Sequence, residues 1–196
     1  GRTAVYVAAD LARRDGGAWD PYTRVFRRDL VTGALSVVGD PAQSGDASSA
    51  RVSGDGRFIA FAGTTNQGVE VFLHDATTGQ ITRVSRPAAT WSTAAHVDIS
   101  ADGRFVVYTR TFEADGDDND TYLYRYEIAT GRTTRPLSAD LGGDVFGVPV
   151  AVSGSGRFIV TTRASIADPV RFPVPDEVVY RLVRVDAASR TSTVVT

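Results

Sequence analysis

The stretch SADGRFVVY, from Ser100 to Tyr108, decides the fold because it recurs along the chain. SGDGRFIAF begins at Ser53 and SGSGRFIVT at Ser153, so the repeat distance is 47 residues (53 to 100) and then 53 residues (100 to 153). The chain begins with GRTAVYV, which resembles the end of a fourth copy. A period of roughly 40 to 50 residues is typical of β-propellers and solenoids.

A second phrase follows each copy of the first. Its four versions are RRDLVTGALSVV around Gly33, LHDATTGQITRV around Gly79, RYEIATGRTTRP around Gly131, and the altered RVDAASRTSTVV that ends at Val195. The two phrases together define four repeats in one domain, or in a fragment of one. Their boundaries fall near 1–40, 41–86, 87–139 and 140–196.

Each repeat is predicted to form a meander of four short strands. In the third repeat, AAHVDIS, RFVVYTR, TYLYRYEI and RTTRPL are separated by Asp102-Gly103, by an acidic loop and by Thr130-Gly131. Asp-Gly favours a tight hairpin because glycine tolerates positive φ and aspartate accepts bonds from nearby amides. We therefore predict strands near 57–62, 69–74, 104–109 and 121–127, and no helix longer than about two turns.

The last hairpin of each repeat has its own pattern. Asp29, Asp75 and Glu127 are placed to accept hydrogen bonds from the Thr-Gly turn that follows them. In the fourth repeat Arg190 occupies the position of the glycine. That turn is therefore expected to differ from the others.

The second strand of each repeat indicates how the sheets pack. FIAFA, FVVY and FIV are continuous apolar runs, so both faces of this strand must be covered. Blades stacked around an axis bury both faces. The sequence thus predicts an all-β fold, a β-propeller of four-stranded antiparallel blades with about four blades present, as a partial ring or half-propeller. Phe58, Phe105 and Phe158 are expected at equivalent buried positions.

The ring is expected to be incomplete. The first repeat lacks its inner strand, so the count is about fifteen strands, and an open ring leaves strand edges and an apolar blade face exposed. Either a second copy of the chain or further blades would have to cover Val5, Tyr6 and the last strand, Thr193 to Val195.

Composition excludes several partners and chemistries. The 196 residues have a formal net charge of −2, and all 21 basic residues are arginine, so no lysine-rich tract is present to bind nucleic acid. Cysteine is absent, which excludes disulfides and thiolate chemistry. No apolar stretch approaches the roughly 20 residues of a membrane span.

The two repeated phrases resemble the TolB-type β-propeller repeat, a WD-repeat-like blade. The resemblance rests on the serine, the acidic-Gly-basic turn, the aromatic-aliphatic strand and the Asp-bearing strand that ends in Thr-Gly. It is strongest in the second and third repeats, since the fourth has Ser155 for the turn aspartate and a proline-rich insert. The resemblance implies an interaction platform, or a propeller beside a peptidase domain. The arginine-, alanine- and valine-rich composition resembles secreted, periplasmic or cell-envelope proteins of GC-rich bacteria.

Catalytic patterns are weak in this sequence. GDG at Gly54 and GSG at Gly154 lead into strands and not into helix N-termini, so neither is a phosphate-binding loop. No Gly-x-Ser-x-Gly elbow occurs, and with only two histidines a serine triad or imidazole-rich metal site is hard to assemble. We therefore predict no catalytic residue and no cofactor, apart from the calcium site considered below. His74 is expected to be exposed.

Arg51, His96 and Asp98 are candidates for lining an axial channel. The first strand of a blade lies nearest the axis, and equivalent positions of these strands carry varied polar residues. The structural alternative is that Arg51 and Asp98 form an ion pair between blades.

The acidic loop EADGDDND, residues 113 to 120, is a candidate calcium site. Asp115, Asp117 and Asn119 alternate, as oxygen ligands of calcium do in Asp-x-Asp-x-Asn loops. Asp120 stands where such a loop usually has glycine, and Glu127 comes one residue too late for the twelfth position. The alternative is a solvated acidic hairpin tip.

Two functions remain open. The first is a non-enzymatic module that binds a protein or polysaccharide partner through its loops or axial channel. The second is the propeller portion of a larger peptidase-type enzyme whose catalytic domain lies outside this sequence.

Overall fold

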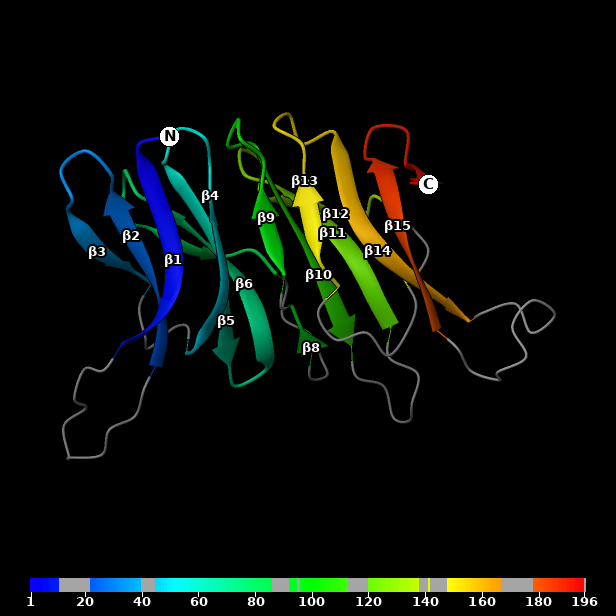
Figure 1. Cartoon of the computed structure of the whole chain (residues 1–196), viewed down its shortest axis with the longest axis horizontal. Coiled ribbons are helices and arrows are strands. Elements are labelled where there is room, and N and C mark those ends of the chain that lie inside the picture. The colour runs from blue at the N-terminus through cyan, green and yellow to red at the C-terminus, as the bar shows by residue number, and fades with distance from the viewer. Residues whose placement is uncertain are drawn as a thin grey trace.

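The computed structural model describes residues 1–10, 22–39, 45–85, 92–94, 96–112, 120–137, 141, 148–166 and 178–195. Every regular element in these ranges is a β-strand, as the sequence predicts. The described residues include no helix that is long and apolar enough to cross a membrane. The strands form sheets that stand side by side in chain order (Figure 1).

The described residues form four antiparallel blades. Within these residues the first blade contains three strands and each later blade contains four. The first consists of β1 (Thr3–Asp10), β2 (Tyr22–Asp29) and β3 (Leu35–Val38). The second consists of β4 (Ala47–Val52), β5 (Phe58–Thr65), β6 (Gly68–Asp75) and β7 (Ile81–Arg83). The third consists of β9 (Val97–Ile99), β10 (Phe105–Phe112), β11 (Asp120–Glu127) and β12 (Arg132–Thr134). The fourth consists of β13 (Val150–Val152), β14 (Phe158–Ile166), β15 (Val178–Asp186) and β16 (Thr191–Val194).

One strand was not expected from the sequence. The short strand β8 (Ser92–Thr93) pairs parallel with β6 and antiparallel with β10, so it joins the second and third blades into one continuous sheet. A side chain at Gly68, which has φ +114°, would collide with the carbonyl oxygen of Ser92. Glycine at position 68 is therefore what allows β8 to approach.

The core lies between the blades, as the continuous apolar runs predict. Most of β5 and β10 is buried on both faces. Three clusters fill the three spaces between neighbouring blades. They are centred on Ile59 and Phe61 between the first and second blades, on Val106 and Tyr108 between the second and third, and on Val107 and Leu123 between the third and fourth.

The repeated opening phrase forms a side-chain-stabilised turn. Ser100 Oγ donates to Asp102 Oδ1 at 2.6 Å and accepts from the Phe105 amide at 3.0 Å, while Asp102 Oδ1 also accepts from the Arg104 amide at 3.1 Å. Ser53 and Asp55 make the same bonds in the second blade. The turn is thus held by its own serine and aspartate, which explains why the phrase recurs.

The glycine of this turn has a second role between blades. A Cβ at Gly103 would lie 3.3 Å from the ring of Phe58, and a Cβ at Gly156 would collide with the ring of Phe105. Each ring is thus covered by the turn of the next blade. Phe105 is buried as predicted, with 4% of its surface exposed, whereas Phe58 and Phe158 are only half-buried.

Arg190 does not change its turn, contrary to the sequence-based expectation. Its φ is +58°, in the same region as Gly33 and Gly79 at +75°. Its amide donates to the Asp186 carbonyl at 2.8 Å, as the Gly33 amide does to Asp29 at 2.9 Å. Asp186 Oδ1 also accepts from the Ala188 amide at 3.0 Å. These bonds hold the turn in its repeated shape although a non-glycine residue is disfavoured there.

Replacing Arg190 by glycine is therefore expected to raise the free energy of unfolding by about 0.5 to 1 kcal/mol, because the left-handed backbone then costs less. Urea denaturation measures the change. The matched control is Gly79→Ala, where a new Cβ has no neighbour within 4 Å and the expected loss of about 1 kcal/mol is conformational. A destabilised Arg190→Gly variant would show that the arginine side chain contributes more than its backbone costs.

The two outermost blade faces carry exposed apolar side chains. Tyr6, which stacks on Phe26 with ring centroids 5.6 Å apart, is 41% exposed, and Tyr180 on β15 is 55% exposed. The equivalent stacked pairs of the second and third blades are Phe61–Phe72 and Tyr108–Tyr124, and Phe61 and Tyr108 are buried against the preceding blade. Val5, in contrast to the expectation, points inward and packs against the first cluster. Tyr6 and Val194 are exposed, and their coverage by a second copy or by further blades stays a prediction.

Candidate functional site

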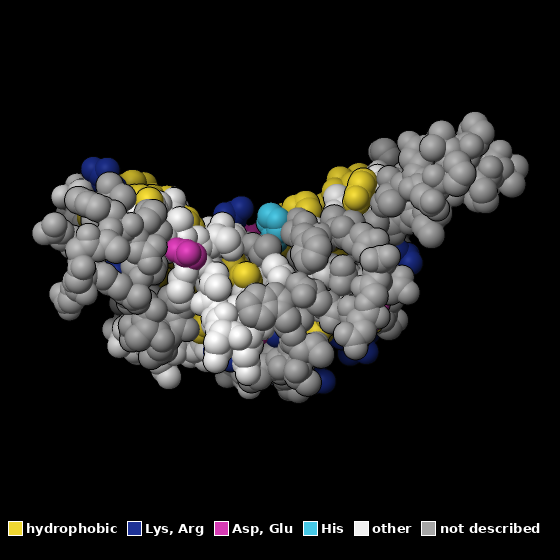
Figure 2. All heavy atoms as spheres, turned by 90° about the horizontal axis from the view of Figure 1, so that it is seen from below, with side chains coloured by type: hydrophobic (Ala, Val, Ile, Leu, Met, Phe, Trp, Pro, Cys, Tyr) yellow, Lys and Arg dark blue, Asp and Glu magenta, His cyan; other side chains and the backbone are white. Residues whose placement is uncertain are grey.

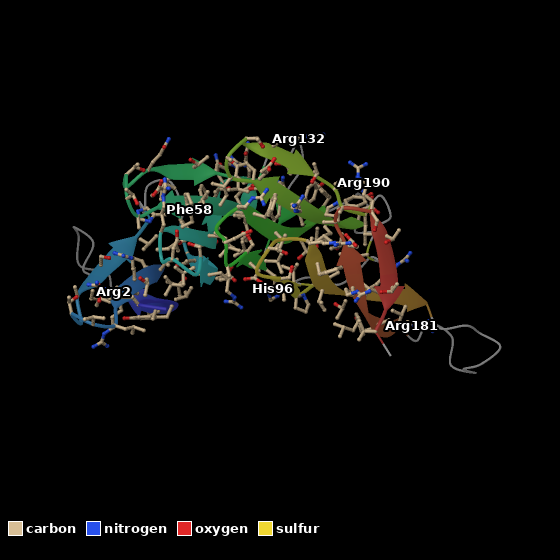
Figure 3. All side chains as sticks on the ribbon, turned by 90° about the horizontal axis from the view of Figure 1, so that it is seen from above. Arg2, Phe58, His96, Arg132, Arg181 and Arg190 are labelled. Atoms are coloured by element: carbon tan, nitrogen blue, oxygen red, sulfur yellow. The ribbon has the colours of Figure 1, made fainter. Side chains whose placement is uncertain are left out.

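The inner strands β4, β9 and β13 face the concave side of the arc of blades. Figure 3 places His96, just before β9, on this concave side and Arg132 on the opposite, convex side. Figure 2 shows the hollow between the two ends of the arc, where a histidine and an arginine side chain are visible. The inner strands therefore line a shared concave surface.

Asp98 connects three blades on this surface. Its Oδ1 lies 3.9 Å from Arg51 Nε of the second blade, and its Oδ2 accepts a hydrogen bond from the Val152 amide of the fourth blade at 2.8 Å. The Asp98 side chain is only 18% exposed, whereas that of Arg51 is 58% exposed. Asp98 thus links the inner strands, and the ion pair that the sequence offered as the structural alternative is present.

The concave surface remains a candidate for binding because its side chains vary between blades. Arg51 on β4 and Asp98 on β9 form a pair, and His96, two residues before Asp98, is half-buried. The position equivalent to Arg51 and Asp98 in the fourth blade is Ala151. A role for Arg51, His96 and Asp98 in lining a channel stays a prediction.

The other site predicted from the sequence falls outside the described residues. Asp115, Asp117 and Asn119 belong to residues 113–119, which the structure does not describe. Calcium binding by these three residues stays a prediction from the sequence.

A buried ionic network was missed by sequence reasoning. Glu70 on β6 is fully buried, and its Oε1 accepts from Arg83 Nη2 at 2.7 Å and from Arg110 Nη2 at 2.8 Å. Its Oε2 accepts a short hydrogen bond from Ser85 Oγ. Arg110 also donates from Nε to Ser92 Oγ at 2.9 Å. The network therefore joins the second blade, β8 and the third blade.

A signal for this network was available in the sequence. Glu70 and Arg110 are single charges within apolar strands that must be covered on both faces, and buried charges need partners. Nothing in the repeat period indicated that these two would meet, since they are 40 residues apart. Both carboxylate oxygens of Glu70 are engaged within the network, whereas Arg83 Nε is buried without a hydrogen-bond partner.

Burial changes the pKa of two further side chains, those of His74 and Tyr108. His74 is half-buried rather than exposed, and desolvation lowers the pKa of its imidazole. Burial raises the pKa of the Tyr108 hydroxyl between the second and third blades. Neither residue lies beside a nucleophile and an orienting acid in a triad-like arrangement among the described residues.

Solved structures share this arrangement of blades. TolB from Acinetobacter baumannii matches with a TM-score of 0.55 and 18% identity over 89% of this chain and 38% of its own. The chain has a TolB-like β-propeller fold. The β-propeller domain of the Trilobed protease from Pyrococcus furiosus matches with a TM-score of 0.66 and 12% identity, over 100% of this chain and 54% of its own. Pyrococcus horikoshii acylaminoacyl peptidase matches with a TM-score of 0.64 and 12% identity, over 99% of this chain and 30% of its own.

These TolB-like structures are longer than the chain, which spans 38% of the first and little over half of the second. No protein-family model and no curated protein sequence matches it. At these identities the likeness concerns the fold. The likeness therefore carries no function over to this chain.

Proposed function

We propose that this TolB-like propeller is a non-enzymatic interaction module that binds a protein or polysaccharide partner through its concave face and adjoining loops. The observation that carries the proposal is the concave surface itself. Its turns and core repeat from blade to blade, yet the side chains at its surface, Arg51, His96 and Asp98, do not repeat. Repeated residues maintain a scaffold, and residues that differ on a rigid scaffold are available for recognition. We place the module in a secreted, periplasmic or cell-envelope setting.

Binding arrays test this proposal. The labelled chain and its labelled Arg51→Ala variant are each applied to arrays of short peptides and of bacterial oligosaccharides. We expect one class of probe to bind and to lose at least tenfold in affinity in the variant. Stability should change little, because exposed ion pairs contribute about 0 to 1 kcal/mol.

The control is Arg132→Ala, which removes an exposed arginine from the convex side. Binding that is equally weakened by Arg132→Ala, or unaffected by Arg51→Ala, would contradict a role for the concave face. Absence of binding to both arrays would contradict the interaction module itself.

A second candidate is the propeller portion of a larger peptidase-type enzyme. The similarity to the acylaminoacyl peptidase, of which this chain covers 30%, favours it. The open reading frame around the 196 residues distinguishes the two. A downstream Gly-x-Ser-x-Gly followed by Asp and His would support the second candidate.

A further inference from the structure

Two arginines of the fourth blade stand directly opposite each other. Arg163 on β14 is the register partner of Arg181 on β15, so their side chains leave the sheet on the same face. Both side chains are exposed, and neither guanidinium forms an ion pair or a hydrogen bond with a described residue. Like charges directly opposite each other destabilise an antiparallel strand pair. The described part of the chain therefore leaves two adjacent cations uncompensated.

The two arginines line a cleft of about 460 Å³. The other described residues that line it are Val183, Ser192 and Val194, and no acidic side chain is among them. Val183 shares its face of the sheet with Val185, which packs in the core between the third and fourth blades. The cleft therefore lies on the side of the fourth blade that faces the third.

The buried carboxylate of Glu70 shows what such a set of side chains binds. Glu70 is held by two guanidinium groups, those of Arg83 and Arg110, and by the hydroxyl of Ser85. The cleft of the fourth blade likewise presents two guanidinium groups and one serine hydroxyl, that of Ser192. Guanidinium groups bind carboxylates through charge-assisted hydrogen bonds. The donors that hold a carboxylate inside the protein are thus also present in the cleft.

The repeat places an arginine at the same point of the third and fourth blades, but supplies a carboxylate to only one of them. Arg163 follows the repeated serine (153 to 163) at the same distance as Arg110 does (100 to 110). Arg110 pairs with Glu70 of the preceding blade, and Glu70 is the register partner of Gly63. The equivalent position of the third blade is held by Tyr122. Arg163 therefore has no counterpart of Glu70 in the blade before it.

We propose that this cleft binds the carboxylate of a glutamate side chain from a polypeptide partner. The carboxylate pairs with Arg163 and Arg181 and accepts a hydrogen bond from Ser192. Val194, which is 49% exposed, packs against the methylene groups of that side chain. Glu70 is the internal precedent for this ligand, which favours a glutamate side chain over a sugar acid or a phosphate.

The probe for this site is the peptide Gly-Glu-Gly, acetylated and amidated at its ends so that it carries one carboxylate. Titration followed by amide NMR should give saturable shifts at Val183 and Ser192, which line the cleft. The peptide Gly-Gln-Gly, blocked in the same way, has a similar shape without the charge and should bind at least tenfold more weakly. Equal binding of the two peptides, or no saturable shifts in the millimolar range, would overturn the proposal.

Inorganic phosphate and galacturonate distinguish a glutamate side chain from other anions. Both should bind more weakly than the glutamate peptide, because neither carries a methylene chain that can pack against Val194. Binding of either anion as tight as that of the peptide would contradict the assignment to glutamate.

Variants test the two arginines one at a time. Arg163→Gln and Arg181→Gln should each weaken binding of the glutamate peptide at least tenfold and leave the glutamine peptide unaffected. The matched control is Arg190→Gln, which removes an exposed arginine of the same blade that lies apart from Arg181 (Figure 3) and does not line the cleft. It should leave binding unchanged, and equal losses in all three variants would show only a general effect of charge.

Arg181→Glu supplies the carboxylate from within the chain. This variant should no longer bind the glutamate peptide, and its melting temperature should rise because opposite charges then face each other across the strand pair. Binding that persists in Arg181→Glu would contradict the proposal. None of Arg51, His96 and Asp98 lines the cleft, so failure here leaves the concave-face proposal standing.

Discussion

Replacing Phe105 by alanine is expected to lower the free energy of unfolding by about 3 to 5 kcal/mol, measured by urea denaturation. The ring is 4% exposed, it is covered by the turn glycine Gly156 of the next blade, and the Arg125 guanidinium lies over it. Its removal would leave a cavity at the contact between the third and fourth blades.

Phe58→Ala is the internal comparison for this prediction. Phe58 occupies the same register position but is only half-buried, since it lines an open cleft between the second and third blades. The loss should therefore be smaller, in proportion to the apolar area that Phe58 removes from water. A loss below about 1 kcal/mol in Phe105→Ala, or equal losses in the two variants, would show that Phe105 is not a central contact between blades.

Replacing Glu70 by alanine is expected to cost about 3 to 5 kcal/mol, because Arg110 would then be a buried cation that has lost its carboxylate. The Arg110 side chain is 4% exposed and Glu70 is fully buried, so water cannot substitute for the missing group. The control is Arg2→Ala, which breaks an exposed ion pair with Asp29 and should cost no more than about 1 kcal/mol.

A double-mutant cycle distinguishes loss of the ionic contact from loss of packing. Combining Glu70→Ala with Arg110→Ala should cost clearly less than the sum of the two single losses, since no buried charge of this pair is then left alone. Strict additivity would contradict the coupling between the two side chains.

The turns and strands of this propeller could be predicted from the sequence because their determinants are local. Ser100 and Asp102 bond to amides within five residues, and the apolar run of β10 directly implies burial on both faces. Arg190 misled the prediction, because the backbone bond to Asp186 outweighs the preference for glycine.

The sites could be predicted only in part, for a different physical reason. The Arg51–Asp98 pair follows from equivalent inner-strand positions, which the repeat period reveals. A cleft between the second and third blades is lined by Leu73, which stands where the other repeats have arginine, and by Gly103 of the next blade, so it forms only when those blades pack. Glu70 and Arg110 likewise meet only across blades. The spacing of the repeats does not predict such contacts, because they form only when the blades pack against each other.

The short strand β8 affects the order in which the blades are expected to unfold. In a repeat protein the stability of each unit comes from itself and from its immediate neighbours, so units can open one at a time from either end. Here β8 hydrogen-bonds to both β6 and β10, and Ser92 on β8 holds Arg110. The second and third blades should consequently open as one cooperative unit of two blades, while the first and fourth blades fray separately. The smallest independently folding piece is then the central pair and not a single blade.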